Sequence, residues 1–263
     1  TSFDAGSFSH TLNGNWSNTG TFNSGTSTFT LNGISVQTIS GSTFNNLSIA
    51  NASGVTMLTD ETVNGTLTLT NGPFSIGAHT LNLNGVLSIG TGSLAGGVSS
   101  NIVVGGIGAS TNIPAITLNN LTLNRANGSS LTGDITIDGT LTILNGTLNT
   151  GTNTVILGPS ATITEVAGQP VVGNITTTRN ITITSGTESF GNIGAQISLN
   201  GVALGNTTIL RKTGTASAGS GHNSIKRYFN ITPSINAGLN AGLVLHYDLT
   251  EVNGQDPNTF ELY

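Results

Sequence analysis

Apolar residues recur along this chain in pairs two residues apart, and successive pairs are separated by a step of 20 residues. The pairs form two runs: Leu47/Ile49, Leu67/Leu69 and Leu87/Ile89, then Leu121/Leu123, Leu141/Ile143, Ala161/Ile163 and Ile181/Ile183. Alternate side chains of a β-strand point to opposite faces, so each pair shares one face and the intervening residue lies on the other. Strands that return at such a fixed period are typical of a β-solenoid, in which each coil stacks on the previous one.

Two further ladders follow the same period. One is about 14 residues out of phase and contains Val63, Leu83 and Val103, then Ile135/Ile137, Val155/Leu157 and Ile175; the third and faintest contains Val55/Met57, Phe74/Ile76 and Leu94. Asn-Gly pairs such as Asn64-Gly65 and Asn84-Gly85 mark the corners, because Asn and Gly accept the positive φ of tight turns. Stacked corner asparagines can also bond to one another between coils. The pattern predicts an all-β chain with a triangular coil, a parallel β-helix over residues 1–205.

A longer repeat overlies the short one. Residues 45–84 match residues 119–158 without a gap, with 16 of 40 positions identical. Their offset of 74 residues is not a multiple of the 20-residue period, because Ile89 and Leu123 are 34 residues apart. We therefore expect an insertion or a change of register in the Gly- and Ser-rich stretch 90–114.

The period fades after residue 205, and the remaining residues have a different pattern. Alternating residues predict strands over Ile225–Ile231 and Gly242–Tyr247, with a third over 259–263. We expect residues 206–263 to form a small antiparallel β-module, incomplete in this chain, at the end of the solenoid. Such an end must be covered, because unpaired strand edges recruit other chains.

Composition and charge narrow the function classes. Charged residues make up 6% of the chain, against about 25% in an average protein, and Gly accounts for 37 of 263 residues. Residues 1–205 carry two arginines and seven acidic residues, and residues 206–263 carry four of each sign. Nucleic-acid binding is not expected, because neutralising phosphates requires clustered Lys or Arg. No apolar run reaches the length of about 18 residues that predicts a transmembrane segment.

The chain contains no cysteine, which removes disulfides, thiolate metal sites and thiol catalysis together. It opens on Thr1 without a signal-peptide pattern and stops in what reads as a strand, so we expect a processed or partial piece of a larger protein. Because disulfides are absent, the stability of the fold must come from the stacked ladders.

Few residues are candidates for chemistry. Polysaccharide-degrading β-helix enzymes need two or three carboxylates that converge on one face, or carboxylates with a bound calcium. Asp60 and Glu61 form the best acidic pair, and Asp134 with Asp138 is next. Asp60 and Asp134 occupy the same repeat position beside a turn, which favours turn hydrogen bonding, with a weak Ca²⁺ site as the alternative. We expect no catalytic residue and no required cofactor.

Other polar and aromatic positions have structural interpretations. His79 occupies the position held by Asn153 in the other copy of the repeat, which predicts an outward turn residue rather than a ligand. Thr66/Thr68 and Thr140/Thr142 align in the long repeat and raise ice binding as a minor alternative, although outward threonine is also the ordinary strand former. Trp16 and the spaced phenylalanines are expected to fill the core or cap an end.

Particular segments resemble a known class of protein. The repeat TVNGTLTLTNG at 62–72 and the segments IKRYFNITP at 225–233 and HYDLTEVNG at 246–254 resemble large surface proteins that some Gram-negative bacteria export by type IX secretion. The repeats alone also resemble filamentous-haemagglutinin and autotransporter passengers, which are right-handed β-helices. The resemblance implies a secreted or cell-surface protein of adhesin or scaffold type, with no catalytic motif to carry over.

Two functions remain open on the sequence. The first is a non-catalytic structural or adhesive scaffold, a segment of a stalk or fibre that self-associates or contacts other surface proteins, matrix proteins or glycans. The second is a polysaccharide-binding or polysaccharide-degrading β-helix protein with its site in the 90–115 stretch. The scarcity of charge and the lack of a clustered acid pair favour the first.

Overall fold

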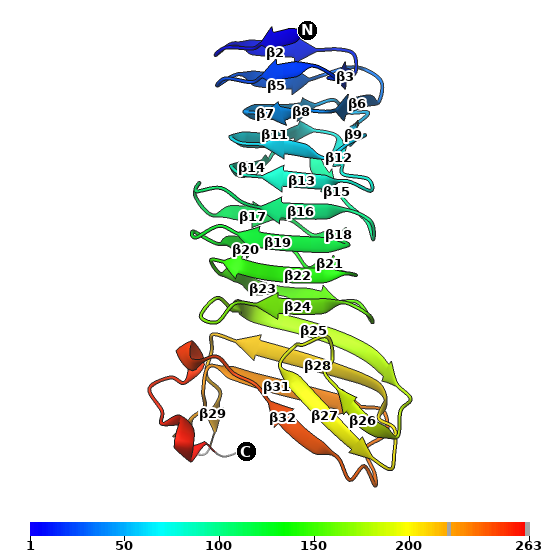
Figure 1. Cartoon of the computed structure of the whole chain (residues 1–263), viewed down its shortest axis with the longest axis vertical. Coiled ribbons are helices and arrows are strands. Elements are labelled where there is room, and N and C mark those ends of the chain that lie inside the picture. Colours follow the sequence, from blue (N-terminus) through cyan, green and yellow to red (C-terminus); the bar gives the residue numbers. More distant parts are fainter. Residues whose placement is uncertain (220–221, 261–263) are drawn as a thin grey trace.

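The computed structural model describes residues 1–219 and 222–260 and is almost entirely β-structure. About nine coils of roughly 20 residues stack into a rod, and a small antiparallel module follows at its C-terminal end (Figure 1). Each coil contributes three short strands, so the rod has three faces, which we number in the order the chain visits them. The predicted parallel β-helix followed by a small antiparallel module is confirmed.

Face 1 contains the Leu67/Leu69 pair, and its strands stack residue for residue: Leu67 lies opposite Leu47 in one neighbouring coil and opposite Leu87 in the other. Where the face passes from β14 to β17, the amide of Leu87 donates to the hydroxyl of Thr111 at 2.9 Å. Its strands are β2 (Ser9–Leu12), β5 (Thr28–Leu31), β8 (Asn46–Ala50), β11 (Thr66–Asn71), β14 (Val86–Ile89), β17 (Thr111–Ile113), β20 (Ser129–Leu131) and the beginning of β23 (Leu148–Leu157).

Face 2 carries the faintest of the three sequence ladders. Phe74 stacks on Val55 and Leu94, and all three side chains are buried. Its strands are β3 (Trp16–Ser17), β6 (Gln37–Ser40), β9 (Val55–Met57), β12 (Pro73–Ser75), β15 (Ser93–Ala95), β18 (Ile116–Leu118), β21 (Ile135–Ile137) and the end of β23.

Face 3 contains a seven-stranded parallel sheet, which is separate from the two-stranded parallel sheet that β1 (Ser2–Asp4) and β4 (Thr21–Asn23) form in the first coils. Val104 rather than the predicted Val103 continues its buried ladder, because Leu81 pairs with Ile102 across a 21-residue coil and the alternation moves by one position. Its strands are β7 (Thr43–Phe44), β10 (Glu61–Val63), β13 (Thr80–Leu83), β16 (Asn101–Val104), β19 (Asn120–Asn124), β22 (Thr140–Asn145) and β24 (Thr162–Glu165).

The slip between Ile89 and Leu123 is not an insertion. Residues 90–114 form β15, β16 and β17, which are ordinary strands of the three faces. Leu121 lies on face 3 opposite Ile102, whereas Leu47, its counterpart in the long repeat, lies on face 1. The second copy of the repeat is therefore turned by one face of the rod, and the two runs of Leu-x-Leu pairs belong to different faces.

Polar side chains also bond between coils at the corners. The amide of Asn84 donates to the Oδ1 of Asn64 at 2.9 Å, and that of Asn120 donates to the Oδ1 of Asn101 at 2.8 Å. The expected bonding between stacked corner asparagines is thus confirmed. These bonds satisfy amide groups that would otherwise compete with the strand pairing.

Arg125 ties together the corners between faces 3 and 1. Its side chain is fully buried, and its guanidinium donates to four main-chain carbonyls of the two preceding coils. Nε bonds Gly105 at 2.7 Å, Nη1 bonds Ala109 at 2.9 Å, and Nη2 bonds Leu83 and Gly85 at 2.7 and 2.8 Å. Burial lowers the pKa of Arg125. The side chain works as a structural cross-link, which explains a buried charge paired only with carbonyl dipoles.

Aromatic rings fill the N-terminal coils. Trp16, Phe29 and Phe44 pack edge to face or tilted, with ring centroids 5.1 to 6.1 Å apart. The indole nitrogen of Trp16 donates to Ser42 Oγ at 2.7 Å. The expectation that Trp16 and the spaced phenylalanines fill the core is confirmed for Trp16, Phe22, Phe29 and Phe44, whereas Phe3 and Phe8 are 43% and 70% exposed.

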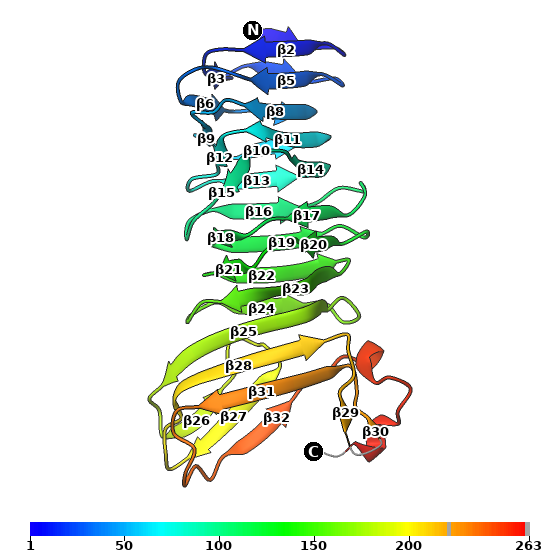
Figure 2. The same ribbon diagram turned by 180° about the vertical axis from the view of Figure 1, so that it is seen from behind.

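β25 (Val171–Ile181) connects the rod to the module (Figures 1 and 2). Its first part pairs in parallel with β23, and most of its length pairs antiparallel with β28 (Gly205–Thr213), which pairs antiparallel with β31 (Arg227–Pro233). The change of direction precedes the boundary expected at residue 205. Ile181 keeps the ladder spacing but pairs antiparallel with Gly205, because spacing identifies a strand and not the direction of its neighbour.

The rest of the module is a second sheet packed against this one. It consists of β26 (Ser185–Glu188), β27 (Ala195–Asn200) and β32 (Gly242–Leu245), all antiparallel, with Phe190, Ile197 and Ile209 among the buried residues. An antiparallel pair of short strands, β29 (Ala218–Gly219) and β30 (His222–Asn223), and two 3₁₀ helices, η1 (Leu249–Glu251) and η2 (Pro257–Thr259), complete it. The strand expected over 259–263 is wrong at its start, where η2 ends, and residues 261–263 lie outside the described part.

Among the described residues, no helix has the length and apolar character that crossing a membrane requires.

The stacking predicts unequal effects at two neighbouring positions of β11. Leu67 is 0% exposed, whereas Thr68 points outward, so Leu67→Asp should lower the free energy of unfolding by about 3 kcal/mol or more through burial of a carboxylate. Thr68→Asp should change it by no more than about 0.5 kcal/mol. Urea unfolding followed by circular dichroism measures both, and equal losses would refute this facing of the strand.

The carbonyl cage predicts that Arg125→Met destabilises the rod by at least about 2 kcal/mol, because four buried acceptors lose their donors. The stability of Arg125→Lys should lie between that of wild type and that of Arg125→Met, because an ammonium donates hydrogen bonds but cannot reproduce the fork of the guanidinium. The matched control is Lys226→Met at an exposed position. Urea midpoints for the three variants decide the matter: a midpoint for Arg125→Met as high as that of the control contradicts the role of the cage.

Candidate functional site

The two aspartates at the shared repeat position play the same structural role. Asp60 Oδ1 accepts the amide of Thr80 at 2.7 Å, and Asp134 Oδ1 accepts the amide of Thr154 at 2.8 Å. Both donors lie one coil further along. The interpretation as turn hydrogen bonding is confirmed, and the repeat brings the two carboxylates to different corners of the rod, Asp60 before face 3 and Asp134 before face 2.

Glu61 points into the rod, away from Asp60. Its side chain is fully buried, and its carboxylate accepts the amide of Ser42 at 3.1 Å and the hydroxyl of Thr59 at 2.8 Å. Burial raises the pKa of Glu61 above its ordinary value, although these hydrogen bonds oppose the shift. Adjacent residues entering a strand face opposite sides, so this acidic pair does not converge on one surface.

His79 lies outward at the corner, as the sequence predicts. Its Nδ1 is 3.9 Å from Asp60 Oδ1, and both side chains are partly exposed, at 31% and 65%. Among the described residues, no three His, Cys, Asp or Glu side chains come together in a way that could hold a metal ion.

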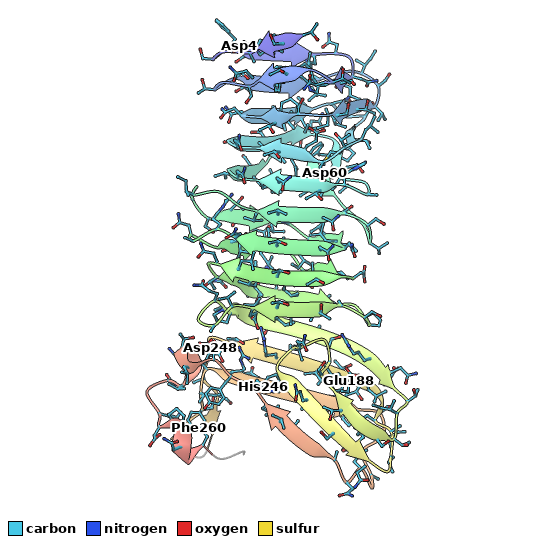
Figure 3. All side chains as sticks on the ribbon, viewed as in Figure 1. Asp4, Asp60, Glu188, His246, Asp248 and Phe260 are labelled. Atoms are coloured by element: carbon cyan, nitrogen blue, oxygen red, sulfur yellow. The ribbon has the colours of Figure 1, made fainter. Side chains whose placement is uncertain are left out.

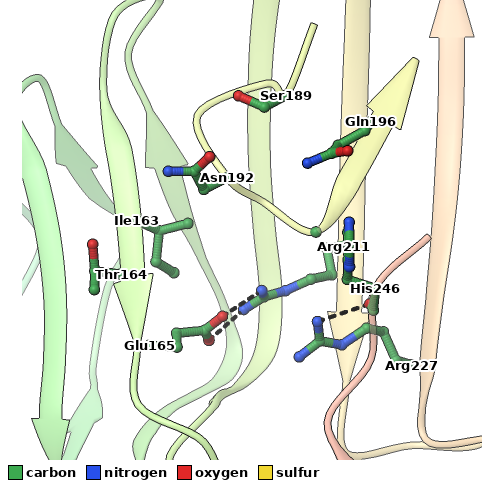
Figure 4. Close-up of a pocket in the computed structure, with 10 residues that line it drawn as sticks. Ile163, Thr164, Glu165, Ser189, Asn192, Gln196, Arg211, Arg227 and His246 are labelled. Atoms are coloured by element: carbon green, nitrogen blue, oxygen red, sulfur yellow. Dashed lines mark hydrogen bonds and ion pairs between the residues drawn. The ribbon is translucent and has the colours of Figure 1, made fainter. Parts of the chain in front are cut away.

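A concave site lies where the rod meets the module, well away from these candidates (Figures 3 and 4). It is a cavity of about 360 Å³, which we call the junction pocket. Strand β24 supplies one wall, the loop before β27 covers it, and β28, β31 and the segment after β32 form the other side. Its lining residues are Ile163, Thr164, Glu165, Ser189, Asn192, Gly194, Gln196, Arg211, Arg227 and His246.

A bidentate ion pair crosses the base of the junction pocket. Arg211 Nη1 and Nη2 each lie 2.7 Å from a carboxylate oxygen of Glu165, and the amide of Val171 donates to the same carboxylate at 2.7 Å. Arg211 is fully buried. Burial alone would raise the pKa of Glu165, but the charge and hydrogen bonds of Arg211 outweigh it and hold that pKa below the ordinary value. The pair joins the last coil to the module.

A second ion pair fastens the C-terminal segment to the same place. Arg227 Nη2 lies 2.7 Å from Glu251 Oε1, and Arg227 Nη1 donates to the carbonyl of His246 at 3.1 Å. Burial and the nearby charge of Arg211 lower the pKa of Arg227. Asp248 caps η1 and also accepts the amide of Gly168 at 2.7 Å, which connects this segment to the rod.

The loop before β27 has an unusual backbone. Phe190 has φ of 50°, a backbone value that a bulky residue rarely adopts, and it is followed by Gly191 and Asn192 with φ of 73° and 64°, which Gly and Asn accept. Glu188 holds the loop by accepting the amide of Phe190 at 2.7 Å while it pairs with Arg179 at 3.3 Å. A strained, well-anchored loop of this kind is typical of positions at functional sites.

Sequence reasoning did not find this site. Arg211 and Glu165 are 46 residues apart, and Arg227 and Glu251 are 24 apart, so no local motif joins them. The available signal was the concentration of basic residues after residue 205 in a chain otherwise poor in charge. That signal shows where the charges are without showing which of them pair.

Comparison of the chain with protein-family models, with curated proteins and with solved structures gave no match.

The Glu165–Arg211 pair predicts an acid-labile junction. A carboxyl whose pKa is lower in the folded state stabilises the fold above its unfolded pKa of about 4.3, and this contribution is lost as pH falls through the folded pKa. Glu165→Gln should lower the free energy of unfolding by about 3 kcal/mol at pH 7, because it leaves Arg211 buried without its counter-charge. On acidification the free energy of unfolding of this variant should fall by less than that of wild type.

Melting temperatures between neutral pH and pH values below that of free glutamate test this prediction. Asp138→Asn is the control, because Asp138 forms no ion pair in the described structure. If the melting temperature of Glu165→Gln falls on acidification as steeply as those of wild type and Asp138→Asn, another carboxylate is responsible for the acid lability of the junction.

Proposed function

We propose that this chain is an extracellular structural and adhesive scaffold of a bacterial cell surface, a rod that forms part of a stalk or fibre. The observation that carries the proposal is the outward surface of the stacked strands. Along face 1, Thr30, Ser48, Thr68 and Ser88 pair in register and form an uncharged row of hydroxyls. Such a rod offers the same small polar groups coil after coil, which suits repeated weak contacts with surface proteins, matrix proteins or glycans.

The use that the fold makes of its acidic residues also supports a scaffold. Asp60 and Asp134 receive main-chain amides of the next coil, and Glu61 closes a buried corner. These carboxylates are engaged in holding coils together. The polysaccharide-degrading alternative needs carboxylates that converge on a substrate, and the corners hold these three apart.

Ice binding is not part of the proposal. Thr66 and Thr68 lie on face 1, whereas Thr140 and Thr142 lie on face 3, because the second copy of the long repeat is turned by one face. The two pairs that align in sequence do not extend a single flat row of threonines.

The export route and setting follow from the resemblance of residues 225–233 and 246–254 to type IX-secreted proteins. In the structure these segments form β31, η1 and the Arg227–Glu251 pair, so they secure the end of the rod. We include type IX secretion in the proposal on this resemblance.

Surface labelling tests the proposal directly. Intact cells of the bacterium that carries the gene are treated with a membrane-impermeant amine reagent, and the chain is recovered with antibodies raised against the purified protein. We expect labelling at Lys212 or Lys226, lost from the surface when a type IX secretion component is deleted. Labelling only after cell lysis, as for a cytoplasmic control protein, would reject the surface location.

A further inference from the structure

The junction pocket contains polar side chains that the fold leaves unused. The side chains of Thr164, Ser189, Asn192, Gln196 and His246 line it without forming a hydrogen bond within the described structure, and Figure 4 shows them around the same space. Ser189 and Gln196 are partly buried, whereas Thr164, Asn192 and His246 are open to solvent. Each of these groups can donate and accept. Elsewhere in the rod, asparagine, glutamine and threonine side chains of this kind bond to neighbouring coils.

The charges of the junction pocket are already neutralised. Both terminal nitrogens of Arg211 are held by Glu165 at 2.7 Å, and those of Arg227 are held by Glu251 and a carbonyl oxygen. The Nε of each arginine is buried without a hydrogen-bond partner among the described residues. An anionic ligand would have to displace a buried carboxylate from one of these arginines, at high cost. The free groups therefore suit a neutral ligand rich in hydroxyl groups.

The rim of the junction pocket is held in place before any ligand arrives. The carbonyl of Gly191 accepts the amide of Ile163 at 2.8 Å, and a Cβ at Gly191 would collide with the carbonyl oxygen of Ala161. This close approach requires glycine and fixes the positions of Ser189 and Asn192 on either side. Preorganised polar groups lose little entropy on binding.

We propose that the junction pocket is a binding site for a neutral saccharide. Its volume of about 360 Å³ lies at the lower end of the range for small-ligand sites, about 300–1,000 Å³. A peptide would need apolar pockets for alternate side chains, and Ile163 is the single apolar side chain among the described lining residues. Saccharide binding at the junction pocket does not depend on the cellular location of the chain, so it can be measured on the isolated protein independently of the scaffold role.

The outward row of face 3 leads to the junction pocket. Thr122 pairs with Thr142, and Thr142 pairs with Thr164, which lines the pocket. A saccharide chain longer than the pocket would thus meet further hydroxyls along the rod. Binding that strengthens with oligosaccharide length would identify a polysaccharide as the natural source, whereas equal binding of a monosaccharide would identify a free sugar.

Titration calorimetry on the intact chain tests the proposal. The probes are mono- and oligosaccharides of glucose, mannose, galactose and N-acetylglucosamine, with oligogalacturonate as the acidic counterpart and a Gly/Ser-rich peptide as the non-sugar counterpart. We expect at least one neutral saccharide to bind, with a Kd of about 1 mM or lower, and the acidic and peptide probes to bind more weakly or not at all.

Matched variants locate the binding. Gln196→Leu and His246→Leu should each weaken it about tenfold, and Asn200→Leu, on the same face of β27 but outside the junction pocket, should leave it unchanged. Melting temperatures confirm that the variants fold. The proposal is overturned by no neutral saccharide binding at about 10 mM, by tighter binding of the acidic or peptide probe, or by binding that neither pocket variant weakens. Surface labelling is unaffected by any of these outcomes, so the two proposals fail separately.

Discussion

Residue-for-residue parallel pairing between successive coils is the constraint on which the rest of this structure depends. It places Leu67 between Leu47 of one neighbouring coil and Leu87 of the other, and it pairs strand amides with carbonyls of the neighbouring coils. Because a shift by one residue would turn every apolar side chain outward, the register has to be held at the corners as well as within the strands. Asn64, Asn84 and Arg125 hold it there with side-chain hydrogen bonds between coils.

The same constraint makes the end of the rod a problem. The last parallel coil leaves a strand edge whose backbone groups need a partner. Strand β25 supplies the transition, because it pairs in parallel with β23 on one side and antiparallel with β28 on the other. The strands of the last coil pair in parallel, whereas those of the module pair antiparallel, so the regular stacking ends at this mismatch. The buried ion pair of Arg211 with Glu165 joins the last coil to the module, and the buried pair of Arg227 with Glu251 holds η1 against β31 within the module.

The junction pocket is a consequence of that mismatch. Where regular stacking stops, the side chains of Gln196 and Asn192 have no equivalent in a neighbouring coil to bond. The loop before β27 covers the space. Its backbone approaches the carbonyl oxygen of Ala161 so closely at Gly191 that only glycine fits there. The scaffold role and the proposed saccharide site thus arise from two parts of one chain, the regular rod and the place where its regularity ends.

The sequence by itself determined the solenoid, its period, most of its buried ladders and the outward position of His79, because these depend on local alternation repeated at a fixed step. Ile89 and Ile183 keep the spacing of the ladders but are 42% and 44% exposed. The sequence could not place the two runs of Leu-x-Leu on their faces, since spacing carries no information about which neighbour a strand meets. Only the tertiary structure decided that Ile181 pairs antiparallel, that Glu61 turns inward, and that Glu165 meets Arg211 across 46 residues. Those contacts join distant segments, and the physical reason they escape prediction is that the pairing energy depends on the fold around them.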